Sequence, residues 1–187
     1  MNHRQISDRK AECEVIFLTP FELEKTLETL TILVDTREHE TAEAVRRWSA
    51  FGKPWRKEKL DSGDYSAELL LPSGETWRVP CVIERKMNLS EICGNFGTNR
   101  GRFIREFERI KESGLKCYLL IENDSWENAY AGRYNSLMKP KALISSLTAW
   151  SARYDAHIVF CKDRTTPKLI AEILYREAKE ILKNGNW

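Results

Sequence analysis

Charged residues gather in a few short segments of this 187-residue chain, and three of these segments contain acids able to take part in hydrolysis. Glu84-Arg85-Lys86 follows the apolar pair Val82-Ile83, which indicates the end of a strand. Side chains alternate along a strand, so Glu84 and Lys86 share one face and Arg85 points to the other. Asp64 comes twenty residues earlier. Two carboxylates and an amine at neighbouring strand ends can hold a hydrated divalent cation and an attacking water.

Two further segments extend this group. Asp35-Thr36-Arg37-Glu38 follows the apolar run 31–34, and Arg102, Arg105 and Arg109 lie on one face of a helix expected over 100–113. Such a stripe of arginines can contact successive phosphates, which gives affinity and position without reading sequence. The same arginines could instead pair with the glutamates of their own helix.

Each segment taken alone also has an ordinary structural interpretation. Glu84-Arg85-Lys86 could be a charged strand exit, Gly63-Asp64 is a common turn pair, and Asp35 could cap a helix. The combination is more specific, because an acid after a buried strand, then Asp64, then Glu-x-Lys follow one another along the chain. This order favours metal-dependent hydrolysis.

Interleaved strands and helices are predicted to position these segments. Apolar runs at 31–34, 117–121 and 157–161 predict buried strands, and the pieces around 55–60, 65–71 and 77–85 predict an antiparallel meander. Apolar periodicity predicts helices from Pro20 (with Thr19 as N-cap), over 41–51, 100–113, 141–154 and 167–182. We therefore expect an α/β fold with a central mixed β-sheet flanked by helices.

The expected organisation is one domain with a lead-in. Residues 1–30 form an N-terminal extension, with a possible strand at 15–18 before the first helix, and residues 31–187 form a single domain that ends in a helix. The chain has no 18-residue apolar run and no apolar core of a secretory signal, so we expect no membrane span and a cytoplasmic location.

Composition excludes several other classes of protein. Lys and Arg number 30 and Asp and Glu 28, so the formal net charge of +2 excludes a polycation. The 42% of hydrophobic residues is enough for a packed core. Five cysteines without a CxxC pair argue against a disulfide framework and against structural zinc, and the three histidines are not paired at metal-binding spacing.

The acidic segments, in this order, resemble the nuclease domain of XPF-type structure-specific endonucleases, which have the restriction-endonuclease-like PD-(D/E)xK fold. The family motif GD…ERKxxxD is matched at Gly63-Asp64 and Glu84-Arg85-Lys86, and the resemblance runs from about Thr31 to Cys161. The chain's size is similar to that of compact phage and prophage members. The resemblance implies a phage origin, with a role in DNA repair or recombination in a bacterial or phage-infected cell, near the nucleoid.

The resemblance also implies roles for the residues that match. Asp64 and Glu84 would bind Mg²⁺ or Mn²⁺, and Asp35 would support the site or bind a second metal. Lys86 would orient or activate water, and Arg37 and Arg85 would lie near the scissile phosphate. Glu38 would complete the first motif, Val34-Asp35-Thr36-Arg37-Glu38. Arg102 matches an arginine on the following helix, where Arg105 and Arg109 extend the DNA-binding face.

Two departures from the family pattern matter. The last Asp of ERKxxxD falls on Ser90, and Glu91 is adjacent, but one step along a helix turns a side chain by about 100°. We favour Ser90 as a helix cap over Glu91 as a substitute acid, because Ser is a good N-cap. In addition, no tandem helix-hairpin-helix region is found, so properties that this module gives to relatives are not implied.

We therefore expect a metal-dependent DNA endonuclease that acts on branched or flap-like DNA and leaves a 5′-phosphate and a 3′-hydroxyl. A non-catalytic nuclease-like module that binds DNA or a partner is the first alternative, although such modules generally lose the acids and the lysine. A sequence-specific restriction-type nuclease is the second alternative. The resemblance also suggests a homodimer through the faces of helices 141–154 and 167–182, although the same faces are equally suited to the core of the domain.

Overall fold

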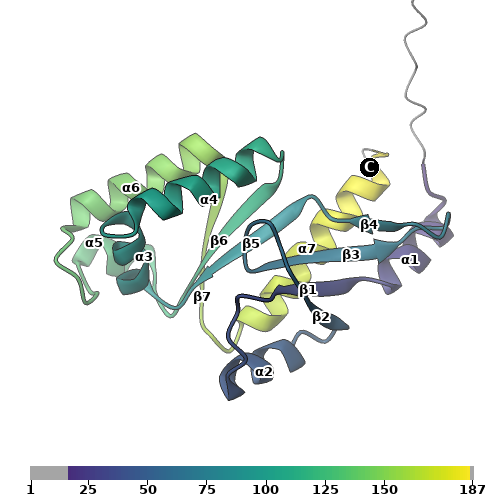
Figure 1. Cartoon of the computed structure of the whole chain (residues 1–187), viewed down its shortest axis with the longest axis horizontal. Coiled ribbons are helices and arrows are strands. Elements are labelled where there is room, and N and C mark those ends of the chain that lie inside the picture. The colour runs from purple at the N-terminus through teal and green to yellow at the C-terminus, as the bar shows by residue number, and fades with distance from the viewer. Residues whose placement is uncertain (1–16, 186–187) are drawn as a thin grey trace, which may run out of the picture.

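Seven strands form one mixed sheet in the part of the chain that the computed structural model describes, residues 17–185 (Figure 1). The strand order is β2-β1-β3-β5-β6-β7, and β4 pairs with β3 beside this path. The strands are β1 (Thr31–Asp35), β2 (Trp55–Glu58), β3 (Tyr65–Leu70), β4 (Thr76–Arg78), β5 (Cys81–Lys86), β6 (Lys116–Glu122) and β7 (Ala156–Cys161). The expected α/β fold with a mixed sheet is confirmed. Of the possible strand at 15–18, residues 15 and 16 lie outside the described residues, and residues 17 and 18 are not in a strand.

The predicted meander is only partly correct. Strand β3 pairs antiparallel with β1, β4 and β5, as a meander requires. Strand β2, however, pairs parallel with β1 and forms one edge of the sheet. The reason is helix α2 (Ala42–Ser49), which crosses between β1 and β2 and returns the chain in its original direction.

The remaining helices are α1 (Pro20–Glu28), α3 (Leu89–Phe96), α4 (Arg100–Glu112), α5 (Trp126–Ala131), α6 (Pro140–Tyr154) and α7 (Thr166–Lys183). The five predicted helices are confirmed, and α1 begins as expected: Thr19 is its N-cap, forms a capping box with Glu22, and Pro20 is the first helical residue. Helices α3 and α5 were not predicted over these spans. Both are short, and their start signals are the caps Asn88 and Ser125.

The two faces of the sheet bury separate cores, because neighbouring strand residues point in opposite directions. Ile83 belongs to the core covered by α1, α2 and α7, whereas Val82 belongs to the core covered by α3, α4 and α6. Leu27 and Leu30, within the expected N-terminal extension, lie in the first core. None of the helices described over residues 17–185 has the length and apolar character needed to cross a membrane.

Candidate active site

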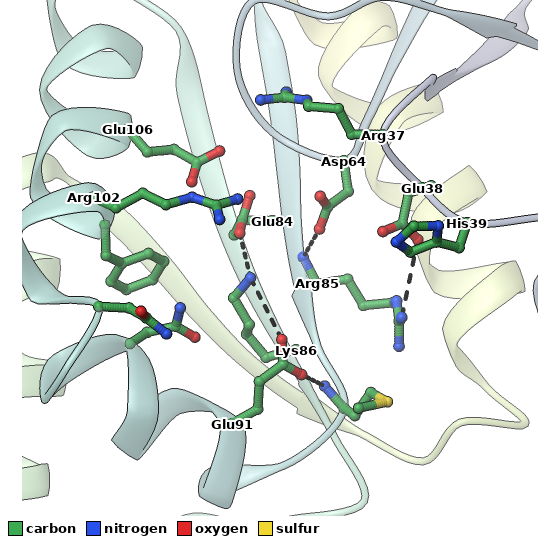
Figure 2. Close-up of a pocket in the computed structure, with 14 residues that line it drawn as sticks. Arg37, Glu38, His39, Asp64, Glu84, Arg85, Lys86, Glu91, Arg102 and Glu106 are labelled. Carbon is green, nitrogen blue, oxygen red and sulfur yellow. Dashed lines mark hydrogen bonds and ion pairs between the residues drawn. The ribbon is translucent and has the colours of Figure 1, made fainter.

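A pocket of about 470 Å³ opens where the carboxyl end of β5 faces helix α4 and the turns next to β1 and β3 (Figure 2). Its wall is mostly charged and consists of Arg37, Glu38, His39, Asp64, Glu84, Arg85, Lys86, Met87, Glu91, Asn95, Asn99, Arg102, Phe103 and Glu106. The fold thus brings together seven of the ten site residues predicted from the sequence. The three that do not line the pocket are Asp35, Arg105 and Arg109.

The Gly63-Asp64 pair is fixed between the ends of β1 and β5. The Asp64 backbone N–H donates to the Ile83 carbonyl at 2.9 Å, and the Asp64 carbonyl accepts from the Asp35 N–H at 2.9 Å. Gly63 has φ +74°, and a Cβ there would lie 2.9 Å from the Val82 Cβ. Position 63 therefore needs glycine for two reasons, its left-handed backbone and its close approach to β5.

Glu84 and Lys86 project together into the pocket from β5, as the alternation of the strand predicted (Figure 2). Glu84 is 3% exposed, and its Oε1 accepts a hydrogen bond from the Lys86 amine. Its second oxygen, Oε2, is buried without a hydrogen-bond partner. The Lys86 amine also lies 5.7 Å from the centre of the Phe103 ring, a cation–π distance. One carboxylate oxygen of Glu84 is therefore free to bind a ligand.

Burial and crowding shift the pKa values of this group. Asp64 is partly exposed to the pocket, yet the surrounding protein raises the pKa of its carboxyl well above the ordinary value, and the Glu84 charge raises it further. Burial also raises the pKa of Glu84, against the opposite effect of Lys86. Burial disfavours the charge of Lys86, but Glu84 and Asp64 outweigh it and hold the pKa of the amine above its ordinary value.

The donor set fits a hydrated divalent cation. In residues 17–185 no three His, Cys, Asp or Glu side chains are already arranged as a metal-binding group. Mg²⁺, however, commonly uses one or two carboxylates and completes its shell with water and substrate phosphate. Asp64 and the unpartnered Oε2 of Glu84 supply two such oxygens, and an added positive charge would favour the ionised form of both crowded acids.

Arg85 lines the pocket from the other face of β5 and is held there by one buried and one half-buried acid. Its Nη1 donates to Glu122 Oε2 at 2.7 Å. Its Nη2 lies 4.0 Å from Glu38 Oε2, as Figure 2 shows. Glu122, at the end of β6, is only 2% exposed, and its Oε1 lies 3.8 Å from Arg47 of α2. Sequence reasoning missed Glu122. Its signal was an acid directly after the buried run 117–121, the same pattern that singled out Asp35.

The Asp35 carboxylate stabilises the local fold of the first motif by accepting hydrogen bonds. It accepts hydrogen bonds from the Arg37 N–H at 2.7 Å, from Arg37 Nε at 2.7 Å and from the Leu60 N–H at 2.7 Å. Asp35 is 1% exposed and lies outside the pocket wall, so this geometry favours the supporting role over metal binding. Glu38 does line the pocket, where its Oε2 accepts from the Tyr65 hydroxyl at 3.2 Å.

The arginines of α4 divide into two groups. Arg102 lines the pocket together with Glu106 (Figure 2). Arg105 and Arg109 are exposed, and neither forms an ion pair with any residue in the described range 17–185. The alternative in which they pair with glutamates of their own helix is therefore not what the structure shows. Their charges remain available to phosphate.

The prediction that Ser90 caps a helix is wrong. Helix α3 begins at Leu89, and its N-cap is Asn88, whose side chain accepts from the Glu91 N–H. The Ser90 hydroxyl instead accepts from the Asn135 N–H at 2.9 Å, in the connection between α5 and α6. Glu91, the substitute that we did not favour, is the residue that lines the pocket. An Asn two residues before Ser90 was the available signal, since Asn is as good an N-cap as Ser.

The mixed sheet, with an Asp and a Glu-x-Lys pair at adjoining strand ends, is the architecture of the restriction-endonuclease-like nuclease domains. A family model described as the ERCC4 domain matches residues 34–175, and the chain belongs to this family. The XPF-type resemblance seen in the sequence is thereby confirmed.

Two solved structures of XPF from Aeropyrum pernix share the fold. One matches with a TM-score of 0.54 and 18% identity over 76% of this chain and 64% of that chain. The other, a complex with DNA, matches with a TM-score of 0.56 and 21% identity over 80% of this chain and 65% of that chain. This chain thus spans just under two thirds of their length. A comparison with curated protein sequences gave no match.

Proposed function

We propose that this chain is a DNA endonuclease that uses Mg²⁺ or Mn²⁺ and acts on branched or flap-like DNA. The observation that supports this most directly is the convergence of Asp64, Glu84 and Lys86 on one pocket, with an oxygen of Glu84 buried and unpartnered. Membership of the ERCC4 domain family supports the nuclease class, and one of the Aeropyrum pernix structures that share its fold is a complex with DNA.

Asp64 and Glu84 are the residues that would hold the ion. Bound there, Mg²⁺ or Mn²⁺ would lower the pKa of a water molecule and neutralise charge on the phosphoryl group. Lys86 is charged and adjacent to Glu84, so it can donate a hydrogen bond to the attacking water or to a phosphate oxygen. Arg37 and Arg102 are exposed on the pocket wall and suit the phosphates on either side of the scissile bond.

Cleavage of labelled DNA tests the proposal. The protein is incubated with flap, fork, nicked and linear duplexes, in Mg²⁺, in Mn²⁺ and in EDTA. We expect the branched substrates to be cut only with metal, and Glu84→Gln to lower the rate by at least about 100-fold. Glu108→Gln is the matched control, since Glu108 is exposed on α4 outside the pocket. Cutting in EDTA, or equal cutting by Glu84→Gln, contradicts the proposal.

The same assay separates the other two classes of function. Tight binding of branched DNA without cleavage in either metal indicates a non-catalytic module, which the intact acid and lysine set disfavours. Discrete cuts in linear duplex indicate a restriction-type nuclease. The homodimer, the phage origin, the role in repair or recombination and the cytoplasmic location stay predictions.

A further inference from the structure

The Glu91 carboxylate contacts the backbone next to Lys86 and also faces the Lys86 amine. Its Oε2 accepts a hydrogen bond from the Met87 N–H at 2.8 Å, and its Oε1 lies 3.8 Å from the Lys86 amine (Figure 2). Since Met87 is the residue after Lys86, one carboxylate both anchors the end of β5 and faces the amine that projects from it. The position of this carboxylate is further fixed by the N-cap Asn88, which accepts from the Glu91 N–H at 3.0 Å.

The Lys86 amine therefore lies between two carboxylates. Glu84 accepts its hydrogen bond on one side, and Glu91 faces it from the start of α3. An ammonium group has three donors and no fixed direction of its own, so acceptors around it decide where it points. Glu84 is the nearer acid and already accepts the amine's hydrogen bond on Oε1, so without the charge of Glu91 at 3.8 Å the amine is free to turn onto the unpartnered Oε2 of the same carboxylate.

We propose that Glu91 is a positioning residue: it holds the Lys86 amine away from the free oxygen of Glu84 and toward the pocket. This inference rests on the proposed function, because it assigns Glu91 a part in the same reaction. It also explains how the chain tolerates Ser90 at the last position of the family motif. The acid lies one residue later, where the turn of α3 directs it into the pocket, while Ser90 faces the connection between α5 and α6.

The variant Glu91→Gln tests the charge alone. A glutamine carbonyl can still accept from the Met87 N–H, so the start of α3 is kept, but the negative charge that faces Lys86 is removed. We expect kcat on flap DNA to fall about 10-fold, with KM for DNA and the Mg²⁺ concentration for half-maximal rate unchanged within twofold. Glu127→Gln is the matched control, because Glu127 is an exposed acid in the first turn of α5. It should cleave as the wild type does.

A measurement that needs no cleavage separates the two proposals. In protein labelled with ¹³C at the lysine ε-carbons, the Lys86 signal is assigned by its loss in Lys86→Arg. We expect this signal to shift in Glu91→Gln and to stay in place in Glu127→Gln. An unshifted signal overturns the inference, whether or not the wild type cuts DNA. A shifted signal in a protein that cuts no DNA overturns the proposed function and supports the contact.

Three further outcomes of the Glu91→Gln experiments would overturn the inference. The first is an unchanged kcat in Glu91→Gln. The second is a rate that recovers fully at high Mg²⁺, since Glu91 would then act as a metal ligand. The third is a loss of rate matched by an equal loss of folded protein in thermal unfolding, since the role would then be structural.

Discussion

Arg85 Nη1 donates to Glu122 Oε2 at 2.7 Å, and this buried pair joins the ends of the parallel neighbours β5 and β6. The two side chains are 11% and 3% exposed. Arg47 of α2 lies 3.8 Å from the other oxygen of Glu122, so the carboxylate stands between two arginines from different elements. This cluster fixes the guanidinium of Arg85 at the pocket wall and ties α2 to the sheet end that carries the candidate site.

Removal of Glu122 should destabilise the fold strongly. Glu122→Ala would leave Arg85 and Arg47 as buried charges without their shared partner, which typically costs about 3–5 kcal/mol in the free energy of unfolding. Urea denaturation followed by tryptophan fluorescence measures this cost. Exposed Glu127, changed to alanine, serves as the reference and should stay within about 0.5 kcal/mol of the wild type. Similar values for the two variants would mean that the cluster contributes little.

Asp35 should give the fold a specific dependence on pH. Burial disfavours its charge, but hydrogen bonds from Arg37 and from the Leu60 N–H outweigh burial and lower the pKa of this carboxyl below the ordinary value of 3.8. A carboxyl whose pKa is lower in the folded state than in the unfolded state stabilises the protein at pH values above its unfolded-state pKa. This stabilisation disappears as the pH falls through the folded-state pKa.

The variant Asp35→Asn isolates that contribution. Its deficit in the free energy of unfolding, relative to the wild type, should be constant from about pH 5 to 7 and should shrink below about pH 4. Urea denaturation at a series of pH values measures the deficit. A deficit that stays the same down to pH 3 would show that the Asp35 charge is not what stabilises the first motif.

The sequence predicted the part of the site that depends on local geometry. Strand alternation alone placed Glu84 and Lys86 on one face and Arg85 on the other, and the structure agrees. The contributions of Glu91 and Glu122 depend on where α3 begins and on which strand lies beside β5. The start of α3 had a local signal in Asn88, whereas Glu122 reaches Arg85, 37 residues away in the chain, only because β6 pairs with β5.

The same limit explains the error over β2. Its short, charged sequence, Trp55–Glu58, has no preference for a particular neighbour, and its parallel pairing with β1 follows from the crossover through α2. Glu122, which was missed, and β2, which was misplaced, share one cause, a contact between segments distant in the chain.

Gly63 should not tolerate even alanine. Its φ of +74° is unfavourable for an L side chain, and the added Cβ would lie 2.9 Å from the Val82 Cβ. Gly74 provides a matched control, because it has φ +86° and no atom within 4 Å of the position of a Cβ. Gly74→Ala should cost about 1 kcal/mol, from backbone strain alone.

Gly63→Ala should cost at least about 2 kcal/mol more than Gly74→Ala, because β3 must move away from β5 to relieve the clash. That movement also displaces Asp64, so cleavage should fall by more than the loss of folded protein accounts for. Thermal unfolding and the flap assay on the same samples measure both effects. Equal stability of the two variants would show that the close approach of Gly63 to β5 has no energetic importance.

Arg105 and Arg109 should contribute affinity for DNA through phosphate contacts. Both are exposed on α4, on the face of the sheet that carries the pocket's helical wall. The double variant Arg105→Gln/Arg109→Gln, made in a Glu84→Gln background to prevent cleavage, should bind more weakly. Its slope of log K against log salt should be shallower by about 0.9 for each phosphate that is no longer neutralised.

Arg176→Gln/Lys183→Gln removes the same charge from exposed positions on α7, which covers the opposite face of the sheet, and should leave binding nearly unchanged. Equally weakened binding in the two double variants would mean that total charge, rather than the arginine face of α4, determines binding.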